Sequence, residues 1–266
     1  MYKAEISADN PSCFVFVIDQ STSMAEEVSN GENTVPKANG VSDTMNRWLS
    51  ELSIKCAKAS GVRDYYHIGV IGYGKKVGTC LAGSSDGSEL VPISVIADNP
   101  ERIEERDSVR MPVWFDAVAD GGTPMCRAAS KTEQVVQGWL DAHPDCFPPI
   151  VIHITDGEAT DGDPESRLAQ LTTLSSSDGP VMLFNIHLSA NPDAHPVCFP
   201  DSEDQLPDEY AKMLFKTASP LTPTMRALAK EYGIKTTDTS RGFVLNADMV
   251  MLVQAIDIGT RPSNLR

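Results

Sequence analysis

The feature that most constrains the fold is a nearly continuous apolar run, Pro-Ile-Val-Ile-His-Ile-Thr at residues 149–155, which ends directly before Asp156. Side chains alternate between the two faces of a strand, so a strand that is apolar at successive positions has both faces covered. A second run, Phe-Val-Phe-Val-Ile at residues 14–18, ends directly before Asp19. Both runs predict parallel strands in a sheet that carries helices on its two faces.

The rest of the chain alternates between helical and strand patterns. Helices are predicted at 41–59, from Thr123-Pro124 to about residue 140, and at 164–174, 208–232 (interrupted at Ser219-Pro220) and 248–258. Strands are predicted at 65–73, 90–96, 181–188 and 242–245. The strands at 65–73 and 90–96, with a Gly/Ser-rich turn at 83–88, predict a hairpin at the sheet edge. The charged stretch 101–110 predicts a loop or a short helix.

This order of elements predicts an α/β fold with a Rossmann-like, doubly wound central sheet. The sheet is expected to be mostly parallel, with one antiparallel edge strand and helices on both faces. The chain has 266 residues, of which 41% are hydrophobic and 22% charged, and no internal linker divides it. We therefore expect a single domain over residues 1–266, with its core at about 12–260.

The charge balance excludes some partners. The formal net charge of -15 repels phosphate backbones and anionic membranes, so neither nucleic acid nor a membrane is an expected partner. No apolar run approaches the length that spans a membrane, and the first residues do not resemble a secretion signal. The six cysteines are dispersed, without a Cys-x-x-Cys pair, which is typical of reduced thiols. We expect a cytoplasmic protein.

Oxygen-bearing side chains follow both apolar runs. Asp19 is followed by Ser21 and Ser23, Asp156 ends the second run, and Thr123 follows Gly121-Gly122. In doubly wound sheets, ligands bind beyond the carboxyl ends of the strands, so these side chains are expected to meet there. Hydroxyls with one or two carboxylates suit Mg²⁺, and Mn²⁺ or Ca²⁺ are alternatives, whereas zinc is disfavoured without His or Cys.

The residue types also predict how such a site works. Ser21, Ser23 and Thr123 are expected to bind the metal directly, while Asp19 and Asp156 bind it directly or through water. Neutral ligands leave the cation electrophilic, so an acidic residue of a partner protein would complete its coordination. The helix that begins at Thr123-Pro124 is expected to direct its positive end toward the site. We expect an interaction module without catalytic residues rather than an enzyme.

This set of residues resembles the metal-ion-dependent adhesion site (MIDAS) of von Willebrand factor type A (VWA) domains, Asp-x-Ser-x-Ser with a distant Thr and a distant Asp. The matching residues are Asp19, Ser21, Ser23, Thr123 and Asp156, and Thr22 stands where glycine is often found. Segments 121–128 and 153–163 are similar to bacterial intracellular members of the tellurite-resistance TerY type. That resemblance implies a stress or signalling system with a protein kinase and a protein phosphatase of the 2C type (PP2C).

The Asp19 segment has two other functional interpretations. A Mg²⁺-dependent phosphohydrolase of the haloacid-dehalogenase type needs a second acid two residues after its nucleophile, where this chain has Ser21. The segment could also be a helix cap and turn without metal. An EF-hand starting at Asp156 is excluded, because its sixth position is Asp161 and its twelfth is Arg167. The acids of this segment form either a rim beside the metal or a solvated loop.

Other residues leave their own alternatives. The pairs His143/Cys146 and His195/Cys198 have zinc-ligand spacing, but they are expected at opposite ends of the sheet and are interpreted as ordinary loop and core residues. Trp114 and Phe115, just before the Thr123 loop, are expected to pack in the core, with a partner contact as the alternative. His153, inside the apolar run, is expected to be a core histidine with satisfied hydrogen bonds.

Overall fold

The computed structural model describes residues 2–81, 89–106, 109–191 and 195–261, and the predicted turn at 83–88 lies outside them. The main sheet has the strand order β15-β16-β14-β11-β1-β6-β7, and β8 also pairs with β6. The strands are β1 (Ser12–Asp19), β6 (Tyr66–Tyr73), β7 (Val77–Thr79), β8 (Val91–Pro92), β11 (Ile150–Thr155), β14 (Met182–Leu188), β15 (Val197–Cys198) and β16 (Phe243–Ala247). The five strands from β16 to β6 are mutually parallel.

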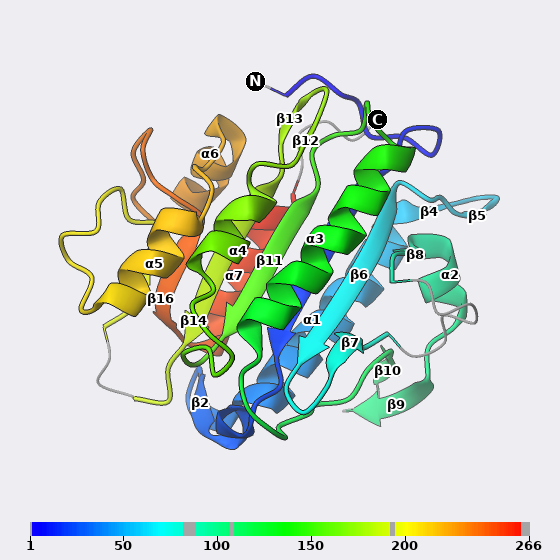
Figure 1. The fold of residues 1–266 in the computed structure, drawn as a ribbon. Helices are drawn as coiled ribbons and strands as arrows, with labels where there is room; N and C mark the ends of the chain where they lie inside the picture. Colours follow the sequence, from blue (N-terminus) through cyan, green and yellow to red (C-terminus); the bar gives the residue numbers. More distant parts are fainter. Residues whose placement is uncertain (1, 82–88, 107–108, 192–194, 262–266) are drawn as a thin grey trace.

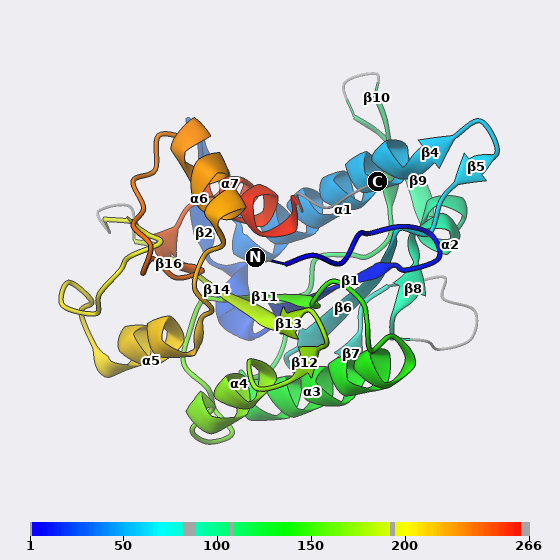
Figure 2. The ribbon, with the colours of Figure 1, turned by 90° about the horizontal axis from the view of Figure 1, so that it is seen from above.

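Helices cover both faces of this sheet (Figures 1 and 2). One face carries α3 (Met125–Ala142), α4 (Glu165–Leu171) and α5 (Glu209–Thr217). The other carries α1 (Lys37–Cys56), α6 (Pro223–Glu231) and α7 (Met249–Thr260). The predicted fold class is confirmed. Within the described ranges, none of the helices is both long and apolar enough to cross a bilayer.

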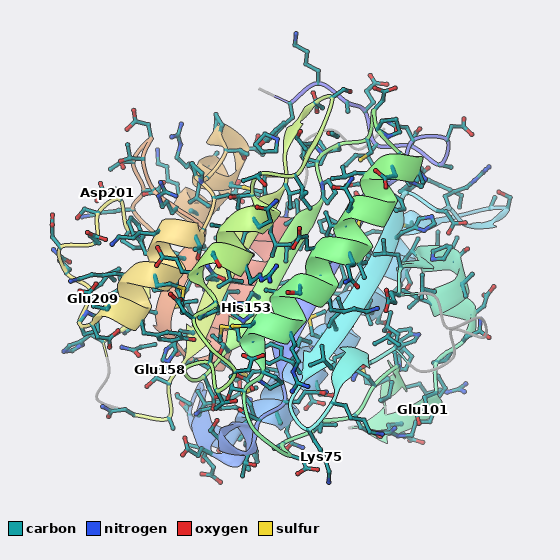
Figure 3. All side chains as sticks on the ribbon, viewed as in Figure 1. Lys75, Glu101, His153, Glu158, Asp201 and Glu209 are labelled. Atoms are coloured by element: carbon teal, nitrogen blue, oxygen red, sulfur yellow. The ribbon has the colours of Figure 1, made fainter. Side chains whose placement is uncertain are left out.

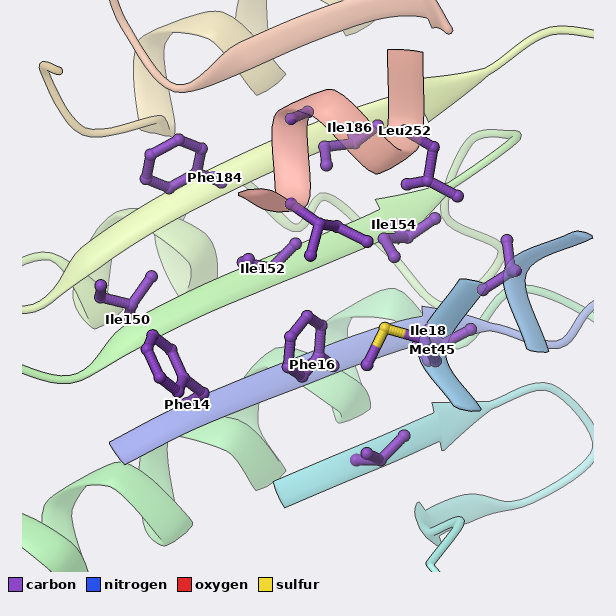
Figure 4. Close-up of a cluster of buried hydrophobic side chains, with 14 of the residues drawn as sticks. Phe14, Phe16, Ile18, Met45, Ile150, Ile152, Ile154, Phe184, Ile186 and Leu252 are labelled. Atoms are coloured by element: carbon purple, nitrogen blue, oxygen red, sulfur yellow. The ribbon is translucent and has the colours of Figure 1, made fainter. Parts of the chain in front are cut away.

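The two apolar runs explain the two core layers. In β1, Phe14, Phe16 and Ile18 point toward α1 and α7, and their register partners in β11 are Ile150, Ile152 and Ile154 (Figure 4). The alternate residues of β1, among them Val15 and Val17, belong to the second apolar cluster, which packs under α3. Burial on both faces is what a continuous apolar run requires.

The strand connections diverge between β1 and β11. The chain leaves β1 toward α1 on one face of the sheet, and it leaves β11 toward α4 on the other face. In doubly wound sheets, ligands bind beyond the carboxyl ends of two adjacent parallel strands whose connections diverge in this way. Asp19 is the last residue of β1, and Asp156 directly follows β11, so both lie at this point of the sheet edge.

The sequence prediction was wrong for the strand at 90–96. Only Val91–Pro92 is a strand (β8), and the chain continues into the short helix α2 (Ile93–Asp98). The carboxylate of Asp64 accepts a hydrogen bond from the N–H of Ser94, which satisfies a free donor of the first helical turn. Ile93 and Ile96 are both buried and lie three positions apart, which is a helical spacing. In an apolar run this short, the sequence alone does not distinguish a helix from a strand.

The charged stretch 101–110 is neither a loop nor a helix. It forms most of an antiparallel ribbon of β9 (Arg102–Arg106) and β10 (Val109–Val113). The guanidinium of Arg102 pairs with the carboxylates of Glu104, two positions on, and Asp116, each at 2.6 Å. Residues two apart share one face of a strand, which explains why this charge pattern suits a ribbon.

The first long helix runs from Lys37 to Cys56 rather than over 41–59. Antiparallel strands lie at both edges of the sheet rather than at one, β7 and β8 at one edge and β15 at the other. The remaining elements are η1 (Thr22–Ala25) and three hairpins: β2 (Glu27–Asn30) with β3 (Asn33–Pro36), β4 (Ala57–Lys58) with β5 (Gly61–Val62), and β12 (Ser175–Ser176) with β13 (Gly179–Pro180).

Candidate metal centre

Asp19 is fixed at the end of β1 by its neighbours on both sides. Because Ile18 pairs with Ile154, the next residues, Asp19 and Thr155, lie side by side. The hydroxyl of Thr155 donates to Asp19 Oδ2 at 3.0 Å, and the N–H of Ser21 donates to Asp19 Oδ1 at 2.8 Å. The carboxylate is buried, since Asp19 is only 1% exposed. Strand register therefore determines where this carboxylate lies.

The two serines connect Asp19 to Asp156. The chain turns into η1 directly after Ser21, which brings Ser21 Oγ to 3.0 Å from Ser23 Oγ. Ser23 Oγ donates to Asp156 Oδ1 at 2.8 Å. Four of the five predicted site residues are thus joined by consecutive hydrogen bonds at the carboxyl ends of β1 and β11. Their role as metal ligands stays a prediction.

Thr123 lies on a loop that is bound to the β1 loop. The N–H and the hydroxyl of Thr22 both donate to the carbonyl of Gly121, at 3.0 and 3.1 Å. Thr22 is not among the described residues with a positive φ, so threonine suits this position as well as glycine does. Thr123 itself is buried. The loop therefore holds Thr123 beside the serine turn.

The predicted start of α3 at Thr123-Pro124 was too early. Helix α3 begins at Met125 after Pro124, without a side-chain cap from the preceding residue. Instead, the carboxylate of Asp161 accepts hydrogen bonds from the N–H groups of Cys126 and Arg127, each at 3.0 Å. Asp161 thus caps α3 from a distant loop, which leaves the Thr123 hydroxyl available to a metal. The positive end of the helix faces Asp161, so it contributes less to the site than expected.

Sequence reasoning missed Lys37, the first residue of α1. Its Nζ lies 2.8 Å from Asp156 Oδ2 and 2.9 Å from Glu26 Oε2. The side chains of Lys37 and Asp156 are both buried, at 3% and 0% exposure. The sequence carried no signal for this contact, because the helix was predicted from residue 41 and Lys37 therefore stood outside its expected first turn.

Burial dominates the electrostatics of Asp19. It raises the pKa of Asp19 to about 6; the nearby charge of Asp156 raises it too, while hydrogen bonds from Ser21 and Thr155 oppose the shift. Asp156 has an ammonium partner in Lys37, but the hydrogen bonds to Asp19 within the described residues come only from neutral donors. A buried carboxylate without a counter-charge is unfavourable. A divalent cation beside these hydroxyls would supply that charge, so the residues fit the metal that the sequence predicts.

The pKa of Asp19 gives a testable pH dependence. A proton and a metal ion compete for the same carboxylate, so the apparent affinity for Mg²⁺ should rise with pH up to about 6 and then level off. At pH 5 it should be about tenfold weaker than at pH 7.5. Calorimetric titration with Mg²⁺ at both pH values measures this difference. An affinity that is equal at pH 5 and pH 7.5 would contradict the assignment of Asp19.

Mg²⁺ affinity should rise with pH, whereas the contribution of Asp19 to the stability of the metal-free protein should fall. Because the folded-state pKa lies above the ordinary value of 3.8, the folded protein binds more protons than the unfolded chain between pH 4 and 6. The contribution of Asp19 to the stability of the metal-free protein therefore falls as the pH rises through this window.

The alternative zinc ligands are not brought together. His143 stacks on Trp139 with ring centroids 3.8 Å apart, ahead of β11, whereas His195 and Cys198 follow β14. Across the described ranges, no three His, Cys, Asp or Glu side chains are grouped so that they could hold a metal.

Figure 3 shows the charged residues around the sheet edge where the parallel strands end. Glu158 and Lys75 lie at this edge, while Glu101 lies near the β9–β10 ribbon.

Two aromatic predictions and one histidine prediction are confirmed. Trp114 and Phe115 are buried, and the indole N–H of Trp114 donates to the carbonyl of Ile96. His153 Nε2 lies 2.7 Å from the hydroxyl of Tyr73, and its Nδ1 lies 3.0 Å from Asn185 Oδ1. Burial lowers the pKa of His153 to about 4, so the imidazole is neutral in the core.

Comparisons with known proteins show only distant similarity. No protein-family model matches this chain, and no curated protein matches it. Proximal thread matrix protein 1 from the mussel byssus is similar over 97% of this chain and 49% of its own, at 16% identity and a TM-score of 0.47. A structure of the same mussel protein with a zinc-occupied MIDAS motif covers the same shares, at 15% identity and a TM-score of 0.45.

A second similar protein is the ArnB paralog VWA2 from Sulfolobus acidocaldarius. It covers 70% of this chain and 36% of its own, at 16% identity and a TM-score of 0.39. Proteins of VWA type are therefore among the structures similar to this chain, which spans about half the length of the mussel protein. At these identities and TM-scores, the similarities assign no function.

Proposed function

We propose that this chain is a VWA-type protein-interaction module that binds an acidic residue of a partner protein through a divalent cation, Mg²⁺ in the cell. The observation that carries the proposal is the buried, unneutralised carboxylate of Asp19 at the end of a line of hydroxyls. Mn²⁺ and Ca²⁺ suit the same oxygen ligands. A bound ion would supply the positive charge that an incoming carboxylate needs.

Each residue of the site has a separate part in this proposal. Ser21, Ser23 and Thr123 supply neutral oxygens to the ion. Asp19 orients Ser21 through its N–H, and Asp156 orients Ser23 through its hydroxyl. Few charged ligands leave the ion attractive to an external anion.

The arrangement favours holding a ligand over hydrolysing one. Ser21 occupies the position of the second acid of a haloacid-dehalogenase-type enzyme, and its hydroxyl bonds to Ser23. Both ring nitrogens of the core histidine His153 are engaged by Tyr73 and Asn185. We therefore propose that the protein is not an enzyme. Turnover of a generic phosphate ester that is lost in Asp19→Asn would support the phosphohydrolase instead.

The cellular context is a finer part of the proposal. The similarity of segments 121–128 and 153–163 to TerY-type proteins supports a cytoplasmic stress or signalling system with a protein kinase and a PP2C-type phosphatase. Its partner would present the acidic residue within a basic surface, because the chain carries a net charge of -15. Affinity for such a partner should therefore weaken with added salt.

Substitution of Thr123 tests the proposed function. Thr123→Ala removes one ligand and no hydrogen bond that the structure assigns to its hydroxyl, so the fold should persist while metal-dependent capture is lost. Pull-downs from the native host in Mg²⁺ and in chelator, read by mass spectrometry, measure this. Thr239→Ala is the matched control, because Thr239 is exposed ahead of β16, at the opposite end of the sheet. Capture by Thr123→Ala equal to wild type in Mg²⁺ would contradict the proposal.

A further inference from the structure

Lys37 is a buried cation within the candidate metal centre. Its Nζ lies 2.8 Å from Asp156 Oδ2, and the other oxygen of Asp156 accepts the hydroxyl of Ser23 at 2.8 Å. The ammonium is therefore separated from a predicted metal ligand by a single carboxylate. Its second partner, Glu26, is 61% exposed, so water screens that charge, whereas the pair with Asp156 is dry.

The position of Lys37 is energetically unfavourable for a charged side chain, which indicates that the charge has a role. Lys37 opens α1, where the helix dipole disfavours a cation, and its charge is removed from water. The hairpin β2–β3 leads directly into this position, and the N–H of Lys37 donates to the carbonyl of Glu26. The backbone thus fixes the position of Lys37, from which its side chain reaches Asp156, and a neutral residue of similar length would fill the same space.

The ammonium changes the charge of the site by one unit. Asp19 and Asp156 carry two negative charges, and Lys37 cancels one of them. A divalent cation then leaves the three side chains and the ion with a net positive charge. Without the charge of Lys37, the two carboxylates and the same ion would sum to zero. The carboxylate of Glu26 would add the same negative charge to both sums, so the difference of one unit remains.

We propose that Lys37 makes the binding of cation and acidic partner interdependent. The ammonium weakens the binding of a divalent cation on its own, because like charges repel, and it strengthens the binding of a carboxylate to the cation-loaded site. By reciprocity, the partner then raises the affinity for the cation by the same factor as the cation raises the affinity for the partner. This inference rests on the proposed function, and Lys37 acts as a positioning and charge-setting residue, not as a ligand.

The first test measures cation binding without any partner. In Lys37→Met, the calorimetric affinity for Mg²⁺ should rise by at least about tenfold. Lys37→Gln is the second variant, because its amide can still donate to Asp156 without a charge and so protects the fold if the methionine variant leaves that carboxylate unpaired. Lys37→Arg retains the charge and should bind Mg²⁺ as weakly as wild type.

The second test measures carboxylate binding to the loaded site. With Mn²⁺ as the ion and acetate as the probe, water-proton relaxation reports the displacement of metal-bound water. Acetate should bind several-fold more weakly to Lys37→Gln than to wild type. Opposite changes in the two affinities are a result that simple damage to the site would not produce.

Lys75 provides the matched control. It lies at the same edge of the sheet and pairs with Asp120 at 3.1 Å, but both side chains are well exposed (Figure 3). Lys75→Met removes the same charge, and its effect on Mg²⁺ affinity should be less than about twofold and vanish at high salt. The effect of Lys37 should persist at high salt, because that charge is buried.

The outcomes separate this inference from the proposed function. Wild-type Mg²⁺ affinity in folded Lys37→Met and Lys37→Gln, or weaker affinity in both, would overturn the inference while leaving the proposed function standing. Failure of wild type and both variants to bind any divalent cation would overturn the proposed function and the inference together.

Discussion

Replacing Asp19 by asparagine should stabilise the metal-free protein and abolish its response to Mg²⁺. The carboxylate is buried, and no described residue gives it a counter-charge, so its removal relieves an unfavourable charge. An amide keeps the acceptor for the N–H of Ser21, and its NH₂ can donate to the hydroxyl of Thr155, which in turn donates to the carbonyl of Gly157. The metal loses a negative charge that neutral oxygen does not replace.

Thermal unfolding with and without Mg²⁺ measures both effects. In chelator at pH 7.5, the Tm of Asp19→Asn should exceed that of wild type by about 2–4 °C, which corresponds to about 1 kcal/mol in a chain of this size. Added Mg²⁺ should raise the Tm of wild type and leave the variant unchanged. Asp120→Asn is the control, since the side chain of Asp120 is exposed at the same edge and pairs with Lys75. A Mg²⁺ response that survives in Asp19→Asn would refute the site.

Substitution of Gly74 by alanine should damage the fold and the site together. Gly74 follows β6, at the point where the loop after β1 meets the loop before α3. A Cβ at this position would lie 2.6 Å from the carbonyl oxygen of Gln20 and 2.7 Å from that of Asp120. Both atoms belong to the backbone, and the N–H of Asp120 donates to the same Gln20 carbonyl, so neither loop can yield alone.

The expected size of this effect is about 2 kcal/mol of unfolding free energy. The affinity for Mg²⁺ should also fall by at least about tenfold, because the two loops carry Ser21 and Thr123, and small displacements of ligands weaken a rigid octahedral site. Urea unfolding and Mg²⁺ titration measure the two quantities. Gly78→Ala is the control, since a Cβ there would meet no described atom within 4 Å. Equal stability of the two variants would count against the close approach.

The fold was predictable where sequence periodicity and burial agree. The apolar runs before Asp19 and Asp156 are long enough to require cover on both faces, and this determined the parallel core of the sheet. The prediction was wrong at 90–96, because two isoleucines three positions apart fit a helix as well as a strand. It was wrong at 101–110 because the pairing of β9 with β10 and the ion pair of Arg102 with Asp116 are tertiary contacts that the charge pattern alone does not indicate.

The site was predictable only in its local parts. The spacing of Asp19, Ser21 and Ser23 is local, and the ends of the apolar runs placed Asp156 beside them. Lys37 and Asp161 could not be found in this way. Lys37 lies 119 residues from Asp156, and Asp161 caps a helix 35 residues before it, so nothing in the neighbouring sequence indicates either contact.

The chain of polar groups through the core has a consequence for how the strands find their pairing. Tyr73, His153 and Asn185 come from β6, β11 and β14, and the Asn185 amide continues to the carbonyl of Leu214 in α5. A slip of β11 by two residues would keep every apolar side chain on its proper face, so the apolar core discriminates weakly against it. That slip would move His153 by roughly 7 Å and strand buried donors and acceptors without partners. These hydrogen bonds thus favour one register of β11 against β14, and that register sets the level of Asp156 at the end of β11 before any ion arrives.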